Sequence, residues 1–84
     1  MFGTRRRIEL LEEELRTAAG HHTELAGHLR GQLAGGAYDH SSSLITRSGA
    51  VQLAGIHDSN AADSTAMADT IHHALHPDFD EEDQ

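Results

Sequence analysis

The sequence predicts a mostly helical α+β fold in one small domain. Three observations lead to this class: apolar residues at heptad spacing over residues 8–29, two short apolar runs around Ser48-Gly49, and a narrow apolar stripe that leads to Pro77. In order, we expect an N-terminal helix (1–34), a Gly/Ser loop with a β-hairpin (35–57), a second helix (58–76) and an acidic tail (77–84).

The N-terminal helix has the clearest pattern, an alternating spacing of three and four residues that is typical of a coiled-coil seam. Its members are Ile8, Leu11, Leu15, Ala18, His22, Leu25 and Leu29. Thr4 is the expected N-cap, and Gly35-Gly36 is the expected end. We expect the chain to self-associate through this seam, with Ile8, Leu11, Leu15, His22, Leu25 and Leu29 as its contacts.

Glycines weaken the second half of this helix. Gly20, Gly27 and Gly31 each cost about 1 kcal/mol relative to Ala in a helix interior. Two interpretations stay open. Either the helix breaks near Gly20, or its bare outer face allows close backbone contact with a second surface.

The β-hairpin is predicted from Leu44–Arg47 and Ala50–Leu53, which flank Ser48-Gly49. An isolated two-stranded hairpin is not stable in water, so it must pack on a helix or pair with another chain. The apolar residues expected to make that partner contact are Leu44, Ile45, Val51 and Leu53.

The second helix is expected to begin near Asn60, with Ser59 or Asn60 as its cap, and to end at His76 before Pro77. Its apolar stripe is Ser64, Met67, Ala68, Ile71, Ala74 and Leu75. The tail that follows carries five acidic residues within 78–83, and its composition favours an extended chain.

The composition predicts a weak core. Leu, Ile, Val and Phe supply 16 of 84 residues, the formal charge is -8, and there is no Cys or Trp. These values exclude a transmembrane span, a disulfide scaffold and a zinc ribbon. Because so small a core barely offsets the entropy of ordering the chain, we expect self-association or docking onto a larger partner.

Two sets of side chains fall on single helical faces at metal-ligand spacing, namely His21, Glu24 and His28, and Asp69, His72 and His76. No Cys and no HExxH motif supports a metal, so no cofactor is predicted, and a metal site stays an alternative. A pH response is the other interpretation of the eight histidines, because protonating all of them moves the formal charge from -8 to 0. His22 is the most informative, since it lies in the predicted seam.

Arg5, Arg6 and Arg7 form the only basic cluster, and they oppose the helix dipole at an N-terminus. We expect them to contact an acidic partner surface, for which the C-terminal acids of another copy are one candidate. The acidic balance argues against nucleic acid, and no broad apolar face is available for a membrane. Since no apolar signal segment follows the arginines, synthesis in the cytoplasm is expected.

Catalysis has no support in the sequence. Asp39, His40 and Ser41–Ser43 contain the residue types of a triad, but they are contiguous in one loop. No GxSxG, Walker or GxGxxG motif is present, and we predict no enzyme activity.

The segment Met1–Glu12, an aromatic residue followed by a basic cluster and a short acidic coiled coil, resembles the start of small proteins of actinobacterial tailed phages. That resemblance implies a virion role such as a minor capsid, decoration or connector protein. We therefore predict a non-enzymatic structural subunit that self-associates and docks on a larger assembly. The alternatives are a His-rich metal-binding or pH-sensing module and a transient adaptor or assembly chaperone. Partner identity and oligomer number stay open.

Overall fold

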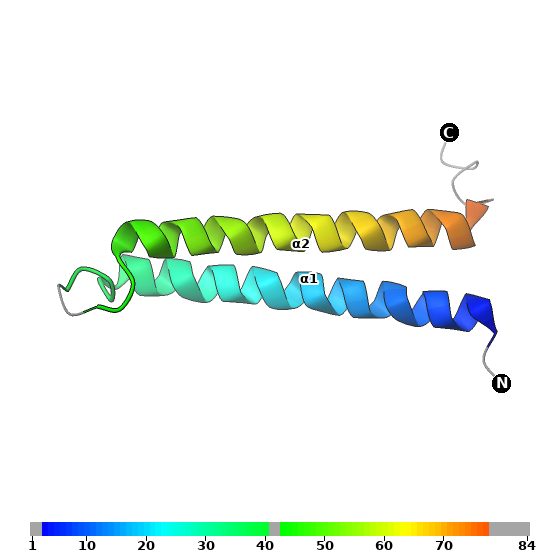
Figure 1. Ribbon diagram of the computed structural model, residues 1–84, viewed down its shortest axis with the longest axis horizontal. Helices are drawn as coiled ribbons and strands as arrows, with labels where there is room; N and C mark the ends of the chain where they lie inside the picture. The colour runs from blue at the N-terminus through cyan, green and yellow to red at the C-terminus, as the bar shows by residue number, and fades with distance from the viewer. Residues whose placement is uncertain (1–2, 41–42, 78–84) are drawn as a thin grey trace.

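The computed structural model describes residues 3–40 and 43–77, which form two long antiparallel helices joined by a short connection (Figure 1). Helix α1 spans Thr4–Ala34 and helix α2 spans Arg47–Leu75. The described residues contain no strand, so the predicted α+β class is wrong. The fold is a helical hairpin, in which each helix covers one side of the other.

Helix α1 ends at Ala34 and is continuous through Gly20, so the interpretation in which it breaks near Gly20 is wrong. Pairs one turn apart support it, with Arg5 3.6 Å from Glu9 and Arg16 3.0 Å from Glu12. A Cβ at any of its three interior glycines would meet nothing within 4 Å, so their bare surface makes no close contact within the described hairpin. The N-cap is Gly3 rather than Thr4, and no side chain caps this end.

The end of α1 follows the prediction. Gly35 is the C-cap, and its N–H donates to the carbonyl of Gly31 at 3.0 Å. Gly36 has φ +81, a left-handed conformation that a side chain makes costly. The chain therefore leaves the helix at the only described residue that adopts a positive φ.

Helix α2 begins at Arg47, well before the predicted start near residue 58, and it replaces the predicted β-hairpin. The hydroxyl of Thr46 caps it by accepting a hydrogen bond from the N–H of Gly49 at 3.0 Å. Gly49 is needed here, because a Cβ would lie 3.0 Å from Cγ2 of Ile45. The expected caps at residues 59 and 60 lie inside the helix, which ends at Leu75, close to the predicted end.

The core is a seam that repeats every four and three residues on both helices. On α1 its members are Ile8, Glu12, Leu15, Ala19, His22, Ala26, Leu29 and Leu33. On α2 they are Ala50, Ala54, His57, Ala61, Ser64, Ala68, Ile71 and Leu75. All sixteen are buried or half-buried. Most of the buried ones are Ala, so the helices pack closely but enclose little apolar volume.

Four of the six residues predicted to form an oligomer seam instead pack against α2 of the same chain. Ile8, Leu15, His22 and Leu29 lie in the seam within the chain, whereas Leu11 is 47% exposed and Leu25 is half-buried beside the seam. The partner of α1 is α2 of the same chain, and the small α2 residues meet the side of α1 that carries Ala19 and Ala26. Leu11 and Leu25 are consequently left at the edge of the contact.

The hairpin is one layer thick. Its shortest extent is 15 Å, and its radius of gyration of 18.0 Å exceeds the roughly 12 Å of a compact domain of this length. Neither helix is both long and apolar enough to span a bilayer, judged over the residues that the structure describes. Because the molecule is one layer thick, both broad sides of the layer are exposed.

Candidate interaction surface

The two broad faces of the hairpin differ in chemistry. Each helix returns to the same side every seven residues, so the seam runs along its whole length. Residues that directly follow a seam position in the sequence lie on one broad face, and residues that directly precede a seam position lie on the other. We call one the charged face; its residues are Arg16, Arg30, Asp58, Asp69 and His72. We call the other the apolar face; its residues are Leu11, Ala18, Leu25, Leu53, Ile56 and Met67.

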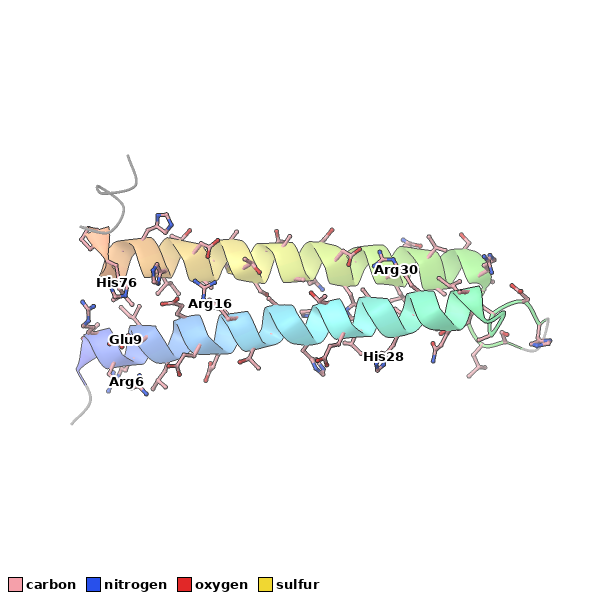
Figure 2. All side chains as sticks on the ribbon, turned by 180° about the vertical axis from the view of Figure 1, so that it is seen from behind. Arg6, Glu9, Arg16, His28, Arg30 and His76 are labelled. Atoms are coloured by element: carbon pink, nitrogen blue, oxygen red, sulfur yellow. The ribbon has the colours of Figure 1, made fainter. Side chains whose placement is uncertain are left out.

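Ion pairs link the helices across the charged face. Arg16 donates to Asp69 at 3.1 Å, and Arg30 donates to both carboxylate oxygens of Asp58. Figure 2 shows Arg16 and Arg30 directed toward α2. These side chains are about half exposed, so each pair adds little stability, but together they occupy the polar groups of this face.

Glu12 is a charged group in the seam. Its side chain is only 15% exposed, and it contacts Arg16 at 3.0 Å and Nδ1 of His72 at 3.3 Å. Burial raises the pKa of Glu12, but the hydrogen bond from Arg16 and the charge of His72 more than offset this, and the pKa lies below 4.5. The carboxylate thus stays charged because both helices supply its partners.

Asp58 is held in the same way. The hydrogen bond from Arg30 lowers the pKa of Asp58 below its ordinary 3.8, against a smaller opposing effect of burial. The charge of neighbouring His57 acts in the same direction as Arg30.

His22 and His57 meet within the seam. Their Nδ1 atoms are 2.9 Å apart, and the ring centroids are separated by 5.2 Å with an interplanar angle of 32°. One ring must donate and the other must accept through a nitrogen that carries no proton. The contact therefore excludes the state in which both imidazoles are fully protonated.

The residues of the apolar face, by contrast, have no polar side chains with which to form such ion pairs. Leu11, Ile56 and Met67 are 47%, 47% and 49% exposed, respectively, and Leu25 and Leu53 are half-buried next to them. They come from both helices, so they form one surface along the hairpin rather than single exposed residues. A shared apolar surface of this kind marks an interaction site.

No family model, curated protein or solved structure matches this chain.

The predicted metal sets do not become sites. His21, Glu24 and His28 are all exposed, and Figure 2 shows His28 on the edge of α1 away from α2. In the second set the rings of His72 and His76 lie 4.6 Å apart, but Asp69 accepts from Arg16 instead. Among residues 3–40 and 43–77, no three potential ligands are grouped to hold a metal ion.

The arginine cluster has a role within the fold that the sequence did not show. Arg5 donates to the carbonyl of Leu75 at 3.2 Å, at the C-terminus of α2, where positive charge is favourable. Arg6 lies 3.9 Å from Glu9 and 3.8 Å from Glu13. Because the helices are antiparallel, the arginines at the N-terminus of α1 lie beside the C-terminus of α2. They oppose the dipole of α1 but interact favourably with the dipole of α2. Arg7 makes no ion pair within the described residues. The C-terminal acids of another copy, suggested as a partner of this cluster, lie outside the described residues.

The four residues expected to form a partner-binding strand are divided among three places. Leu44 is fully exposed and Ile45 lies beside it in the connection between the helices. Val51 lies on the side of the charged face, and Leu53 lies on the apolar face. They do not form one surface, because a helix separates neighbouring residues by about 100° instead of placing them along an edge.

Sequence reasoning missed His57 and Asp58 as contact residues. The predicted bounds place His57 at the end of the loop and hairpin segment and Asp58 at the start of the second helix. The available signal was the alternating spacing of four and three residues that runs through Ala50, Ala54 and His57 into Ala61. Alanine is a weak apolar marker, and the repeat was therefore overlooked.

Proposed function

We propose that this chain is a non-enzymatic structural subunit that self-associates through its apolar face and docks on a larger assembly. The observation that carries this proposal is a single layer of two helices with exposed apolar residues from both helices on one face. Stable domains are built from at least two packed layers around an apolar core. A second layer from outside the chain supplies what the hairpin lacks.

The arrangement of the other polar groups supports a non-enzymatic role. Glu12, Arg16 and His72 are hydrogen-bonded or ion-paired with one another across the helices, which is a structural use of these groups. An open hollow lined by Asp69, Thr70 and His73 is formed by α2 alone, so it does not surround a substrate.

For the larger assembly we propose a phage particle, with the loop end of the hairpin as its contact. The particle is suggested by the resemblance of residues 1–12, of which residues 1 and 2 lie outside the described part. The loop contact is supported by Leu44, which is fully exposed beside Ile45. Mass spectrometry of purified particles would find the chain in stoichiometric amounts; its absence from the particles would contradict this part.

The test of self-association compares two glutamate substitutions on α2. Met67 is 49% exposed on the apolar face, and Val51 is 56% exposed on the side of the charged face. Removing an apolar side chain from an interface costs about 1.5 kcal/mol per copy, so Met67→Glu should weaken a dimer about 100-fold. Val51→Glu is the matched control and should leave association unchanged.

Light scattering at several concentrations measures both variants beside the unaltered chain. We expect the unaltered chain and Val51→Glu to have the mass of an oligomer at micromolar concentration, and Met67→Glu to approach the monomer mass. A helical, sharply melting monomer of the unaltered chain under these conditions would contradict the proposed function.

A second candidate function, pH sensing, is supported by the contact between His22 and His57. The bond joins the two helices and is lost when both rings are protonated. Around it, Asp58 is the charged neighbour of His57, and Arg30 is bonded to Asp58. Helicity and mass should then change between about pH 7.5 and pH 5.5. An unchanged mass and helicity over that interval would exclude a sensing role.

A further inference from the structure

We propose that two copies pack apolar face to apolar face, as an antiparallel pair whose two-fold axis crosses the hairpin at the level of His22. This deepens the proposed self-association, on which it rests, by naming the partner and its register. The partner is a second copy of this chain, and the product is a four-helix bundle in which α1 packs on α1 of the partner and α2 on α2. Three properties of the apolar face carry it.

The first property is the spacing of apolar residues on α1. Ala18 and Leu25 are equally distant from the point between His21 and His22. An antiparallel copy centred at that point places Leu25 of each chain opposite Ala18 of the other. A large side chain then meets a small one at both places, which is the complementarity that close helix packing needs.

Helix α2 has the same property at the same level. Its two exposed apolar residues on this face, Ile56 and Met67, are equally distant from the point between Ala61 and Ala62. The contacts of Glu12 with His72 and of His22 with His57 place the centres of α1 and α2 level with each other to within about one turn. One axis therefore serves both helices, and it sets Ile56 against Met67 of the partner.

Charge is complementary in the same register. Glu14 and His28 are exposed on the outer flank of the apolar face and lie on either side of the α1 centre. In the antiparallel pair, Glu14 of each copy lies beside His28 of the other, so an acidic group meets a group that accepts a proton. A parallel pair would instead have its two-fold axis along the hairpin and place α1 on α2 of the partner, so Glu14 and His28 of the two copies would not meet.

The size of the face is sufficient for a stable dimer. Helices of about 30 residues are about 45 Å long, and two adjacent helices are about 20 Å wide. Such a face offers about 900 Å² per copy, and a standard protein interface buries about 800 Å² on each partner. The charged face is less suited to a second copy, because its polar groups are already paired within the chain.

The chain has no cysteine, so introduced cysteines report the register without background. Chains with Ala18→Cys and with Leu25→Cys, one of them extended by a tag, are mixed in equal amounts and oxidised. The same is done with Ile56→Cys and Met67→Cys. Thr23→Cys, on the side of the charged face, is the control. Light scattering confirms the oligomeric state of each reduced variant before oxidation.

We expect each mixture to form mostly the mixed disulfide, at least ten times more than either variant forms with itself, and the control to form little. Dominant disulfides between two copies of the same variant would overturn the antiparallel register while leaving self-association intact. Dimeric mixtures that form no disulfide would overturn it as well. Reduced chains that stay monomeric would instead contradict the proposed function on which the register rests.

Discussion

At the residue scale, the contact between His22 and His57 decides how the seam responds to acid. A hydrogen bond between two imidazoles requires one unprotonated ring nitrogen, and here the two Nδ1 atoms are 2.9 Å apart. When both rings take up protons, the bond is replaced by repulsion inside the helix contact. Glu12 and His72 act in the opposite sense, since protonated His72 pairs more strongly with Glu12 at 3.3 Å.

We predict that the unfolding temperature is lower at about pH 5.5 than at about pH 7.5, because the bond between His22 and His57 is lost in the state in which both rings are fully protonated. Replacing both seam histidines by leucine should remove most of this difference. His40→Leu changes an exposed histidine of the connection and should preserve it. Circular dichroism melts of the three proteins at one concentration measure the effect, and a difference that persists in the double variant would refute the assignment to this pair.

A separate loss of stability is expected at lower pH. Because the pKa values of Glu12 and Asp58 are lowered in the folded chain, their contribution is present above the unfolded values of 4.5 and 3.8. This stabilising contribution disappears as the pH falls through the lowered pKa values of the two carboxylates in the folded chain. Arg16→Gln and Arg30→Gln together remove the partners of both carboxylates and should flatten this acid limb in the same melts, and leave the higher-pH limb unchanged.

At the element scale, small residues determine how closely the helices approach. Ala50 and Ala68 are 0% exposed, and Ala26 is 1% exposed, so the tightest part of the seam has no room for a larger side chain. Burial of these alanines supplies less apolar area than leucines would.

We predict that Ala68→Leu destabilises the hairpin by about 1 to 3 kcal/mol, since extra methyl groups must push the helices apart. Ala66→Leu is the matched control two residues away on the exposed side of α2, where the same change should alter stability by less than about 0.5 kcal/mol. Urea unfolding of the two variants gives the comparison. Equal stabilities would mean that the seam is not tightly packed at Ala68.

The two helices differ in how readily the sequence predicted them. For α1, leucines at heptad spacing and the Gly35-Gly36 stop were sufficient to predict a helix that ends at Ala34. The first part of α2 was mistaken for a β-hairpin because Ser48-Gly49 between two apolar runs fits a tight turn equally well. Two features favour the helix, namely the cap that Thr46 forms with the N–H of Gly49 and the alanine repeat that packs on α1. Both depend on residues outside the two-residue turn pattern.

At the scale of the whole molecule, the hairpin is a layer without a second layer. Its shortest extent of 15 Å leaves both broad faces in solvent, and only one of them is closed by ion pairs. Self-association would convert the apolar face into a core. Folding would then be linked to association by mass action.

This linkage predicts a stability that depends on concentration. The unfolding temperature should rise by several degrees when the chain concentration rises 100-fold, because a dimeric state gains about 2.7 kcal/mol from that increase. Met67→Glu should melt at a lower temperature with a weaker dependence. Calorimetry at three concentrations is the measurement, and identical melting temperatures at all three would contradict a folded state that requires a partner.

The sequence pointed to several residues of the candidate surface, but it did not show which surface they form. Leu11 and Leu25 were predicted to be members of the seam, but in the structure they flank it. Which of two adjacent apolar rows on α1 faces inward depends on α2, and the sequence of α1 contains no information on that choice. Arg5 shows the same dependence, since its partner is the end of the other helix.

The sequence by itself determined a small, acidic, largely helical chain with few large apolar residues for its core. Those properties follow from composition and from the period of the side chains along a single helix. Only the tertiary structure decided that α1 and α2 pair within one chain, that His22 meets His57, and that Leu11, Leu25, Ile56 and Met67 share one face. The physical reason is that a period fixes positions around one helix axis, whereas a face exists only once a second helix has covered part of the first.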